Sequence, residues 1–337
     1  MKAFVFHQTG EPADVLALED LPTPEPAANE VLVRMRLAPI NPSDLHVLRG
    51  RFGRQPPLPA SPGLEGMGTV EAIGRDVHGL SPGTRVVLLD VPGTWRALIV
   101  APADRVVPIP HGVSDEDAAQ ALVNPVTALA MILGVHRLQR GDTLVQTAAG
   151  STVGRLVIQL ARTIGFRTMN LVRRADQLDG ILVAGGDVAI CTAAEGWEAQ
   201  LLAATNGSGA MHAIDCVAGA VGAGVVRCLA PGGRMLVYGA LSSHRQTDVT
   251  AFQMPLFAPQ LIYKAATVQG WYLFHWLAVT PLDETRRMLE HALELLASGG
   301  LRLPHVTRYP LSEIDSALRA AEASRRDGKP LLDFADA

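Results

Sequence analysis

A short run of small residues, Ala148 to Gly154, follows an apolar segment at residues 143–147. Small residues let backbone N–H groups come close to a pyrophosphate, and the N-terminus of a helix attracts its negative charge. Apolar residues then recur with helical spacing up to Ile164, and Gly165 follows where a helix would be capped. The pattern predicts a strand, a phosphate-binding turn and a helix. The turn residues expected to contact a dinucleotide are Ala149, Gly150, Ser151, Thr152, Val153 and Gly154.

Two arginines follow the next apolar segment, at residues 168–172. In a site for NAD, an acidic residue about 20 positions after the glycines binds the ribose 2′-hydroxyl. Here Arg173 stands 19 residues after Gly154, with Arg174 beside it. A guanidinium in that place favours a 2′-phosphate, so the expected cofactor is NADPH. The alternative is that both arginines end a strand in solvent, since surface arginines are common.

The composition limits the possible partners. Of the 337 residues, 48% are hydrophobic and 18% charged, and the formal net charge is -4, which argues against a general affinity for nucleic acid. The cysteines at 191, 216 and 228 are too few and too widely spaced for a disulfide framework. No apolar run has the length of a membrane span. We expect a cytoplasmic protein with a small-molecule substrate and with neither nucleic acid nor membrane as a partner.

The pattern of secondary structure changes along the chain. Residues 1 to about 110 contain short strand-like runs broken by Pro and Gly. From about residue 115, strand-like and helix-like segments alternate, which indicates a parallel sheet. The tail carries a long amphipathic helix near 282–298 and a helix followed by a strand near 311–332. This order predicts an α/β protein of two domains.

Several motifs together resemble the medium-chain dehydrogenase/reductase superfamily over nearly the whole chain. They are Asn41 to Asp44, Pro62 to Gly66, Gly74 with Leu80 to Gly83, Ala148 to Gly154, Pro231 to Gly233 and Gly328 to Leu332. The resemblance implies a β-rich GroES-like N-terminal domain, residues 1–120 and 262–337, and a Rossmann domain with a doubly wound parallel sheet, residues 121–261. It also implies a homodimer.

The zinc ligands of the alcohol dehydrogenases in that superfamily are missing. The positions that resemble the catalytic ligand sites are Asn41 to Ser43 and Gly63 to Glu65, with Leu64 where a histidine would stand. No cysteine precedes Cys191, so the four clustered cysteines of a structural zinc are missing as well. We expect no metal, and alcohol oxidation through a zinc alkoxide becomes the less favoured reaction.

The zinc-free branches that the chain resembles are quinone oxidoreductases and the mitochondrial-type 2-enoyl thioester reductases. Segments such as Asn124 to Ala128, Thr168 to Arg173 and Gly270 to Trp276 favour the second branch. In that branch a tyrosine in a Gly-x-Tyr-Gly stretch is associated with proton delivery, and the matching residue here is Phe52. Because Phe52 has no hydroxyl, the proton donor is left open.

The resemblance also suggests further site residues. Asn41, Phe52 and Trp271 are the candidates at the catalytic site, and His46, Ser43, Asp44, Tyr272 and His275 are possible proton donors, as is a water. Beyond the turn and the two arginines, the cofactor contacts expected are Asn124, Thr127, Val217, Tyr238 and Gly239.

Three functions stay open from the sequence. The favoured one is an NADPH-dependent, zinc-independent reductase of the C=C bond in an α,β-unsaturated carbonyl compound, such as a 2-enoyl thioester. The alternatives are an NADPH:quinone oxidoreductase and a non-catalytic NADPH-binding protein, the latter suggested by the missing hydroxyl at Phe52.

Overall fold

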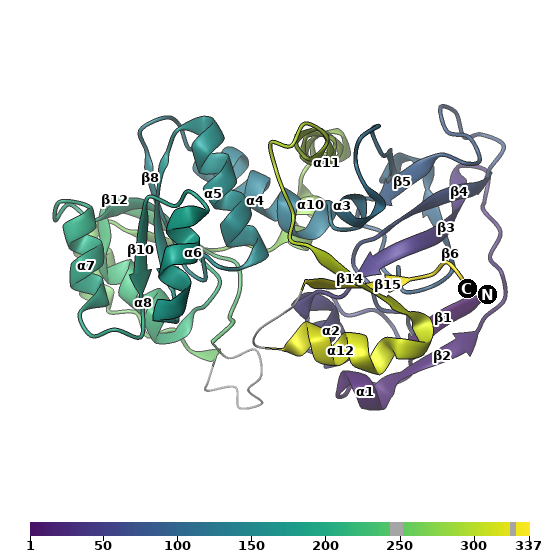
Figure 1. Ribbon diagram of the computed structural model, residues 1–337, viewed down its shortest axis with the longest axis horizontal. Coiled ribbons are helices and arrows are strands. Elements are labelled where there is room, and N and C mark those ends of the chain that lie inside the picture. Colours follow the sequence, from purple (N-terminus) through teal and green to yellow (C-terminus); the bar gives the residue numbers. More distant parts are fainter. Residues whose placement is uncertain (243–251, 324–327) are drawn as a thin grey trace. The chain divides into compact units, whose positions relative to one another are not determined.

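The computed structural model describes residues 1–242, 252–323 and 328–337. Within them the chain forms two compact units (Figure 1). The first unit consists of Met1–Val126 and Leu277–Ala337, and the second of Thr127–Trp276. In the described residues, no helix has both the length and the apolar character needed to cross a membrane.

The first unit is rich in strands, as the sequence predicts. A two-stranded sheet pairs β1 (Lys2–Phe6) with β2 (Leu16–Asp20). A seven-stranded sheet has the order β14-β15-β3-β4-β5-β7, and β6 also pairs with β3. The strands of this larger sheet are β3 (Glu30–Pro39), β4 (Met67–Ile73), β5 (Arg85–Leu88), β6 (Leu98–Pro102), β7 (Val106–Pro108), β14 (Val306–Pro310) and β15 (Lys329–Asp333).

Alternate residues of β3 form the core of this sheet. Val31, Val33, Met35 and Leu37 are each at most 1% exposed, and their period of two places them on one face. Because β3 pairs with β15 on one side and with β4 on the other, the residues that follow β3 lie between these two neighbours.

Short helices surround the sheet of the first unit. They are α1 (Pro12–Val15), α2 (Pro42–Leu48), η1 (Ala103–Arg105), α3 (Asp115–Ala119), η2 (Leu122–Val126), η6 (Leu311–Glu313) and α12 (Ile314–Glu322), together with the longer α11 (Leu282–Ala297). The buried residues of α11 include Thr285, Leu289, Ala292 and Leu296, which recur at steps of three and four as the predicted amphipathic helix requires.

The second unit is a doubly wound sheet of six parallel strands in the order β10-β9-β8-β11-β12-β13. The strands are β8 (Thr143–Gln146), β9 (Arg167–Val172), β10 (Val188–Cys191), β11 (Ala210–Asp215), β12 (Leu229–Val237) and β13 (Thr267–Gly270). The direction of chain progress reverses between β8 and β11, and ligands of such sheets bind outside the carboxyl ends of the strands at this point. The predicted fold class is confirmed.

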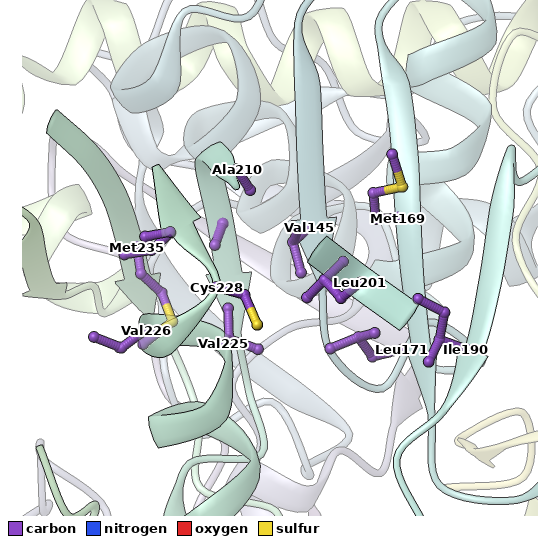
Figure 2. Packing of buried hydrophobic residues seen from close by; sticks show 12 residues of the cluster. Val145, Met169, Leu171, Ile190, Leu201, Ala210, Val225, Val226, Cys228 and Met235 are labelled. Carbon is purple, nitrogen blue, oxygen red and sulfur yellow. The ribbon is translucent and has the colours of Figure 1, made fainter. Parts of the chain in front are cut away.

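Helices cover both faces of this sheet. The helical segments are α4 (Thr127–Leu129), η3 (Ala130–His136), α5 (Thr152–Ile164), η4 (Ala175–Gln177), α6 (Leu178–Val183), α7 (Trp197–Ala204), α8 (Gly219–Arg227), α9 (Ala258–Lys264) and the start of α10 (Leu273–Val279). On one face, Leu201 of α7 and Val225 of α8 belong to the same hydrophobic cluster as Met169 and Leu171 of β9 (Figure 2). On the other face, Ile158 of α5 forms a hydrophobic cluster with Val172, the last residue of β9, and with Ile181 of α6.

The end of the second unit lies later in the chain than the expected boundary at residue 261. Residues 262–276 belong to this unit because β13 pairs with β12, from Thr267 opposite Arg234 to Gly270 opposite Val237. The short strand β13 was absent from the sequence-based prediction, and its four residues carry too few apolar side chains to signal a strand.

Candidate functional site

The turn between β8 and α5 has the conformation that the small residues permit. Ala148 adopts a left-handed conformation with φ +47°, and Ser151 caps α5 by accepting a hydrogen bond from the Gly154 amide, 3.2 Å. A Cβ on Gly154 would lie 2.6 Å from the carbonyl oxygen of Ala149, so only glycine allows the helix this close. Since the first amides of a helix have no partner within it, this turn presents donors suited to an anion.

A buried amide pair anchors this turn to the sheet. The Gln146 side-chain amide donates to the carbonyl oxygen of Gly154, 3.0 Å, and to Oδ1 of Asn170, 2.7 Å. Asn170 in turn donates to the carbonyl oxygen of Val188 on β10, 2.9 Å. Sequence reasoning gave these residues no role, although two fully buried polar residues in neighbouring parallel strands are a signal in themselves.

Arg173 and Arg174 directly follow β9, beside an open cavity of about 550 Å³. The cavity is lined by Arg173, Arg174, Ala175, Leu178, Ala189, Cys191, Ala193, Ala194 and Gln200. Arg174 forms an ion pair with Asp176, 2.9 Å. Arg173 is exposed, and in the part of the chain that the structure describes no carboxylate forms an ion pair with it. Its guanidinium is therefore available to a phosphate.

A polar network closes the carboxyl ends of β8 and β11. The Thr147 hydroxyl donates to Oδ1 of the buried Asp215, 2.6 Å. The carboxylate of Asp215 also accepts hydrogen bonds from the amides of Val217, 2.9 Å, and Ala218, 3.0 Å. Burial raises the pKa of Asp215, and these three hydrogen bonds act against that rise by favouring the carboxylate. The network fixes the loop that carries Val217 at the strand-order reversal.

The next two strands bring Tyr238, Gly239 and Trp271 to the same edge of the sheet. The Tyr238 hydroxyl faces the buried Cys216 thiol; burial raises the pKa of the thiol to about 11 and that of Tyr238 well above its usual value. Both groups therefore stay protonated at neutral pH. A Cβ on Gly239 would lie 3.1 Å from Cys216, so these strand ends are closely packed. The Trp271 indole N–H is buried and has no hydrogen-bond partner among the described residues.

The remaining candidates divide between the two units. Asn124 lies in η2 at the end of the first stretch of the first unit, and Thr127, 6% exposed, begins the second unit. Tyr272 is half-buried, with its ring centroid 5.7 Å from that of Phe274, and His275 is exposed.

The first unit holds the other catalytic candidates. Ser43 and His46 lie on α2 and are half-buried, and Phe52, also half-buried, follows the end of that helix. Asp44 is fully buried, and its carboxylate caps α2 by accepting the Asn41 amide, 2.7 Å. The structure therefore brings five of the expected residues together around one short helix.

The positions that resemble zinc ligands hold a different chemistry. Asn41 donates through Nδ2 to Oε1 of Glu65, 2.9 Å, and accepts at Oδ1 from the Lys329 ammonium, 2.5 Å. These residues do not fit a zinc ion, because Leu64 offers no donor atom and an ammonium already binds Asn41. Within the described residues no group of three or more His, Cys, Asp or Glu side chains could hold a metal ion. Sequence reasoning gave Lys329 no role.

Comparisons with known proteins agree with the fold and with these motifs. A family model described as the alcohol dehydrogenase GroES-like domain matches residues 27–111, and one described as zinc-binding dehydrogenase matches residues 152–300. The chain is 33% identical to human mitochondrial enoyl-[acyl-carrier-protein] reductase over 98% of this chain and 88% of that protein. The chain belongs to the medium-chain dehydrogenase/reductase family. The resemblance stated from its motifs is confirmed.

The names of similar solved structures describe a second activity, the reduction of quinones. A Bacillus thuringiensis protein described as an NADPH:quinone reductase is 32% identical, with a TM-score of 0.91 and 98% of each chain covered. A mycobacterial protein solved in complex with NADPH is 27% identical, with a TM-score of 0.85 and 99% of each chain covered. The chain is therefore an oxidoreductase of this dehydrogenase/reductase family. The names of its relatives describe two kinds of hydride acceptor, an enoyl-[acyl-carrier-protein] and a quinone.

Proposed function

We propose that the protein is an NADPH-dependent reductase that transfers hydride to the C=C bond of an α,β-unsaturated carbonyl compound, with a 2-enoyl thioester as the favoured substrate. The observation that carries the proposal is Arg173, exposed at the end of β9 beside an open cavity. A guanidinium with no carboxylate partner in the described residues can bind the 2′-phosphate that distinguishes NADPH from NADH.

Other residues of the second unit fit the rest of such a cofactor. The glycine-rich turn offers the first amides of α5 to a pyrophosphate, with the proposed contacts running from Ala149 to Gly154. The unpartnered indole N–H of Trp271 and the loop at Val217 lie at the carboxyl ends of the strands, where nicotinamide cofactors bind in such sheets. We include Asn124, Thr127, Tyr238 and Gly239 among the proposed contacts.

The bound cofactor would supply a hydride, and the chain must supply the rest of the reaction. Reduction of an activated C=C bond also needs hydrogen-bond donors for the developing enolate oxygen and a proton for the α-carbon. Phe52 offers neither, so we propose His46 or Tyr272 as the source of the proton, directly or through a water, and Phe52 as an apolar wall of the substrate site. Asn41 is buried with both polar atoms engaged, so we assign it a positioning role.

The acceptor is tested by anaerobic stopped-flow oxidation of NADPH. Crotonyl thioesters, simple enones and 1,4-quinones are compared at matched concentrations, with the absorbance of NADPH as the readout. We expect the thioester and the enones to be reduced with larger kcat/KM values than the quinones. Turnover of quinones alone would contradict the proposal.

A quinone oxidoreductase is the second candidate, and the apolar side chain of Phe52 favours it. A quinone needs no proton at carbon, so loss of the tyrosine hydroxyl costs that reaction less than it costs reduction of an enoyl thioester. The third possibility, a non-catalytic protein, would be supported by tight NADPH binding without turnover of any acceptor in the panel.

We propose a homodimer in which two copies pair through β13. This strand lies at the edge of the six-stranded sheet, and a free strand edge is a template for pairing with another chain. The preceding helix α9 exposes Ile262 and Tyr263, 70% and 86% accessible, beside that edge. Analytical ultracentrifugation should give twice the chain mass, and a monomer at micromolar concentration would contradict this.

We propose the cytoplasm as the compartment of the protein. The three cysteines, all of them free in the structure, suit a reducing environment. Labelling of all three thiols by a maleimide after denaturation without reductant, in protein taken directly from its source cells, is the expected result.

A further inference from the structure

Four charged or polar side chains form a buried cluster in the first unit: Lys329, Asn41, Glu65 and Asp44. Their residues are 5%, 2%, 1% and 0% exposed. Three of these side chains make a chain of hydrogen bonds, from the Lys329 ammonium to Asn41, 2.5 Å, and from the Asn41 amide to Glu65, 2.9 Å. Asp44 holds the backbone amide of Asn41, 2.7 Å.

The strand pairing explains how these residues meet across 288 positions of sequence. Strand β15 pairs antiparallel with β3, with Leu331 opposite Pro39, and the Ile40 amide continues the ladder by donating to the carbonyl oxygen of Pro330. Two residues further along the same register, Lys329 lies opposite Asn41. Glu65 stands just before β4, the other neighbour of β3.

Glu65 connects this chain of hydrogen bonds to residues 122–126, the last residues of the first unit before the second unit begins. Its second carboxylate oxygen, Oε2, accepts the backbone amides of Leu122, 3.1 Å, and Val123, 2.7 Å. These amides begin η2, which contains Asn124 and leads directly to Thr127. If the Glu65 carboxylate were protonated or replaced by an amide, at least one of the donors from Asn41, Leu122 and Val123 would have a poorer acceptor.

We propose that Lys329 is a positioning residue whose ammonium holds Asn41 and keeps Glu65 in place as the ionised anchor of the crossover segment 122–126. The proposal rests on the proposed function only for the role of Asn124 and Thr127 as cofactor contacts. The fixed cation compensates two buried carboxylates, and without it at least one of them would take up a proton.

The electrostatics of the cluster support this role. Burial raises the pKa of Glu65, whereas the amides of Val123 and Leu122, the Asn41 side chain and the Lys329 charge lower it. Burial likewise raises the pKa of Asp44 to about 7, and the charge of Lys329 opposes that rise while Glu65 adds to it. Removing the ammonium therefore raises both pKa values further.

The test is hydrogen exchange at the crossover, measured by mass spectrometry on peptides covering residues 118–128. In Lys329→Met we expect the amides of Leu122 and Val123 to lose at least about tenfold in protection. Peptides covering β4 and β5 should be unchanged. Lys264→Met is the matched control, because the Lys264 ammonium binds the carbonyl oxygens of Arg227 and Leu229 in the second unit, 2.7 Å each. Unchanged protection at 122–123 in a folded Lys329→Met protein would overturn the proposal.

Two further variants separate charge from packing. Glu65→Gln should lose protection to an extent that does not depend on pH, because the single oxygen of a glutamine cannot accept from both the Asn41 amide and the two backbone amides. In Lys329→Met the loss of protection should become smaller as the pH rises, because a higher pH favours the carboxylate form of Glu65. Lys329→Gln keeps a donor to Asn41 without the charge, and it is the variant to use if Lys329→Met does not fold. A loss of protection that is independent of pH in both Lys329 variants would show a purely structural role.

Activity gives a separate readout. If the wild-type protein binds NADPH, Lys329→Met should lower kcat/KM about tenfold at pH 7 and by less at higher pH, whereas Lys264→Met should not change the pH profile. If the wild-type protein does not bind NADPH but exchange at 122–123 changes as expected, the proposed function fails and the role of Lys329 stands.

Discussion

Arg173→Ala is the most informative single substitution for the cofactor. Arg173 is exposed and has no carboxylate partner within the described residues, so it gives up no ion pair when it binds a phosphate. Arg174 is already paired with Asp176 at 2.9 Å, with side chains 37% and 52% exposed. The two neighbours should therefore contribute unequally to the binding of NADPH.

The size of the effect follows from these surroundings. A hydrogen bond to a charged group contributes about 1.5–3 kcal/mol, and exposure to solvent places Arg173 at the lower end of that range. A loss of about 1.5–2 kcal/mol corresponds to a Kd for NADPH raised roughly 10- to 30-fold. Arg174→Ala should raise the Kd only about two- to fivefold, because an exposed ion pair already competes for that guanidinium.

The assay is a fluorescence titration of each variant with NADPH and with NADH at low and at high salt. The Kd for NADH should stay within about twofold in Arg173→Ala, since the 2′-hydroxyl carries no charge for the guanidinium to bind. The difference between the two cofactors should shrink at high salt. An equal loss of affinity for both cofactors, or no loss for NADPH, would refute the assignment of the phosphate to Arg173.

Three further predictions concern the turn, the substrate site and acid stability. Gly154→Ala should destabilise the protein by about 1–3 kcal/mol in urea denaturation, because its Cβ would lie 2.6 Å from a backbone oxygen, whereas Gly180→Ala in α6 meets nothing within 4 Å and should be neutral or slightly stabilising. Phe52→Tyr should raise kcat for crotonyl thioesters several-fold and leave quinone reduction unchanged; an unchanged rate with both would remove position 52 from proton delivery. Burial and the neighbouring His212 lower the pKa of His136 to about 4. As the pH falls, the imidazole is therefore protonated in the unfolded chain before it is protonated in the folded protein, and the free energy of unfolding should fall by roughly 2–3 kcal/mol between pH 6.5 and pH 4. His136→Gln should flatten that slope in urea titrations, and an unchanged slope would show that other groups cause the acid sensitivity.

Local patterns predicted most of the second unit. The turn, α5 and β9 lie within about 30 consecutive residues, so spacing alone relates Gly154 to Arg173. In the first unit, the helix expected near 282–298 is present as α11. The strand β13 was missed because its side chains are mostly exposed and polar, and only its pairing with β12 identifies it.

The buried cluster of the first unit could not be predicted in the same way. Lys329 and Asn41 are joined by strand register, and no local pattern records which strands become neighbours. A lysine directly before a run of apolar residues reads as a charged strand end in solvent. The polar residues Gln146 and Asn170 could have been noticed, since each interrupts an apolar segment of the sequence and both are fully buried.

The discontinuous make-up of the first unit has a consequence for synthesis on the ribosome. The 150 residues from Thr127 to Trp276 form a contiguous unit, and they can collapse as soon as they have left the exit tunnel. The β3 edge that receives β15 stays open until Lys329 to Asp333 have been translated and have emerged, because these residues complete it. During that interval the nascent chain exposes an open sheet edge, so chaperone binding should be strongest after the second unit has folded and before β15 emerges.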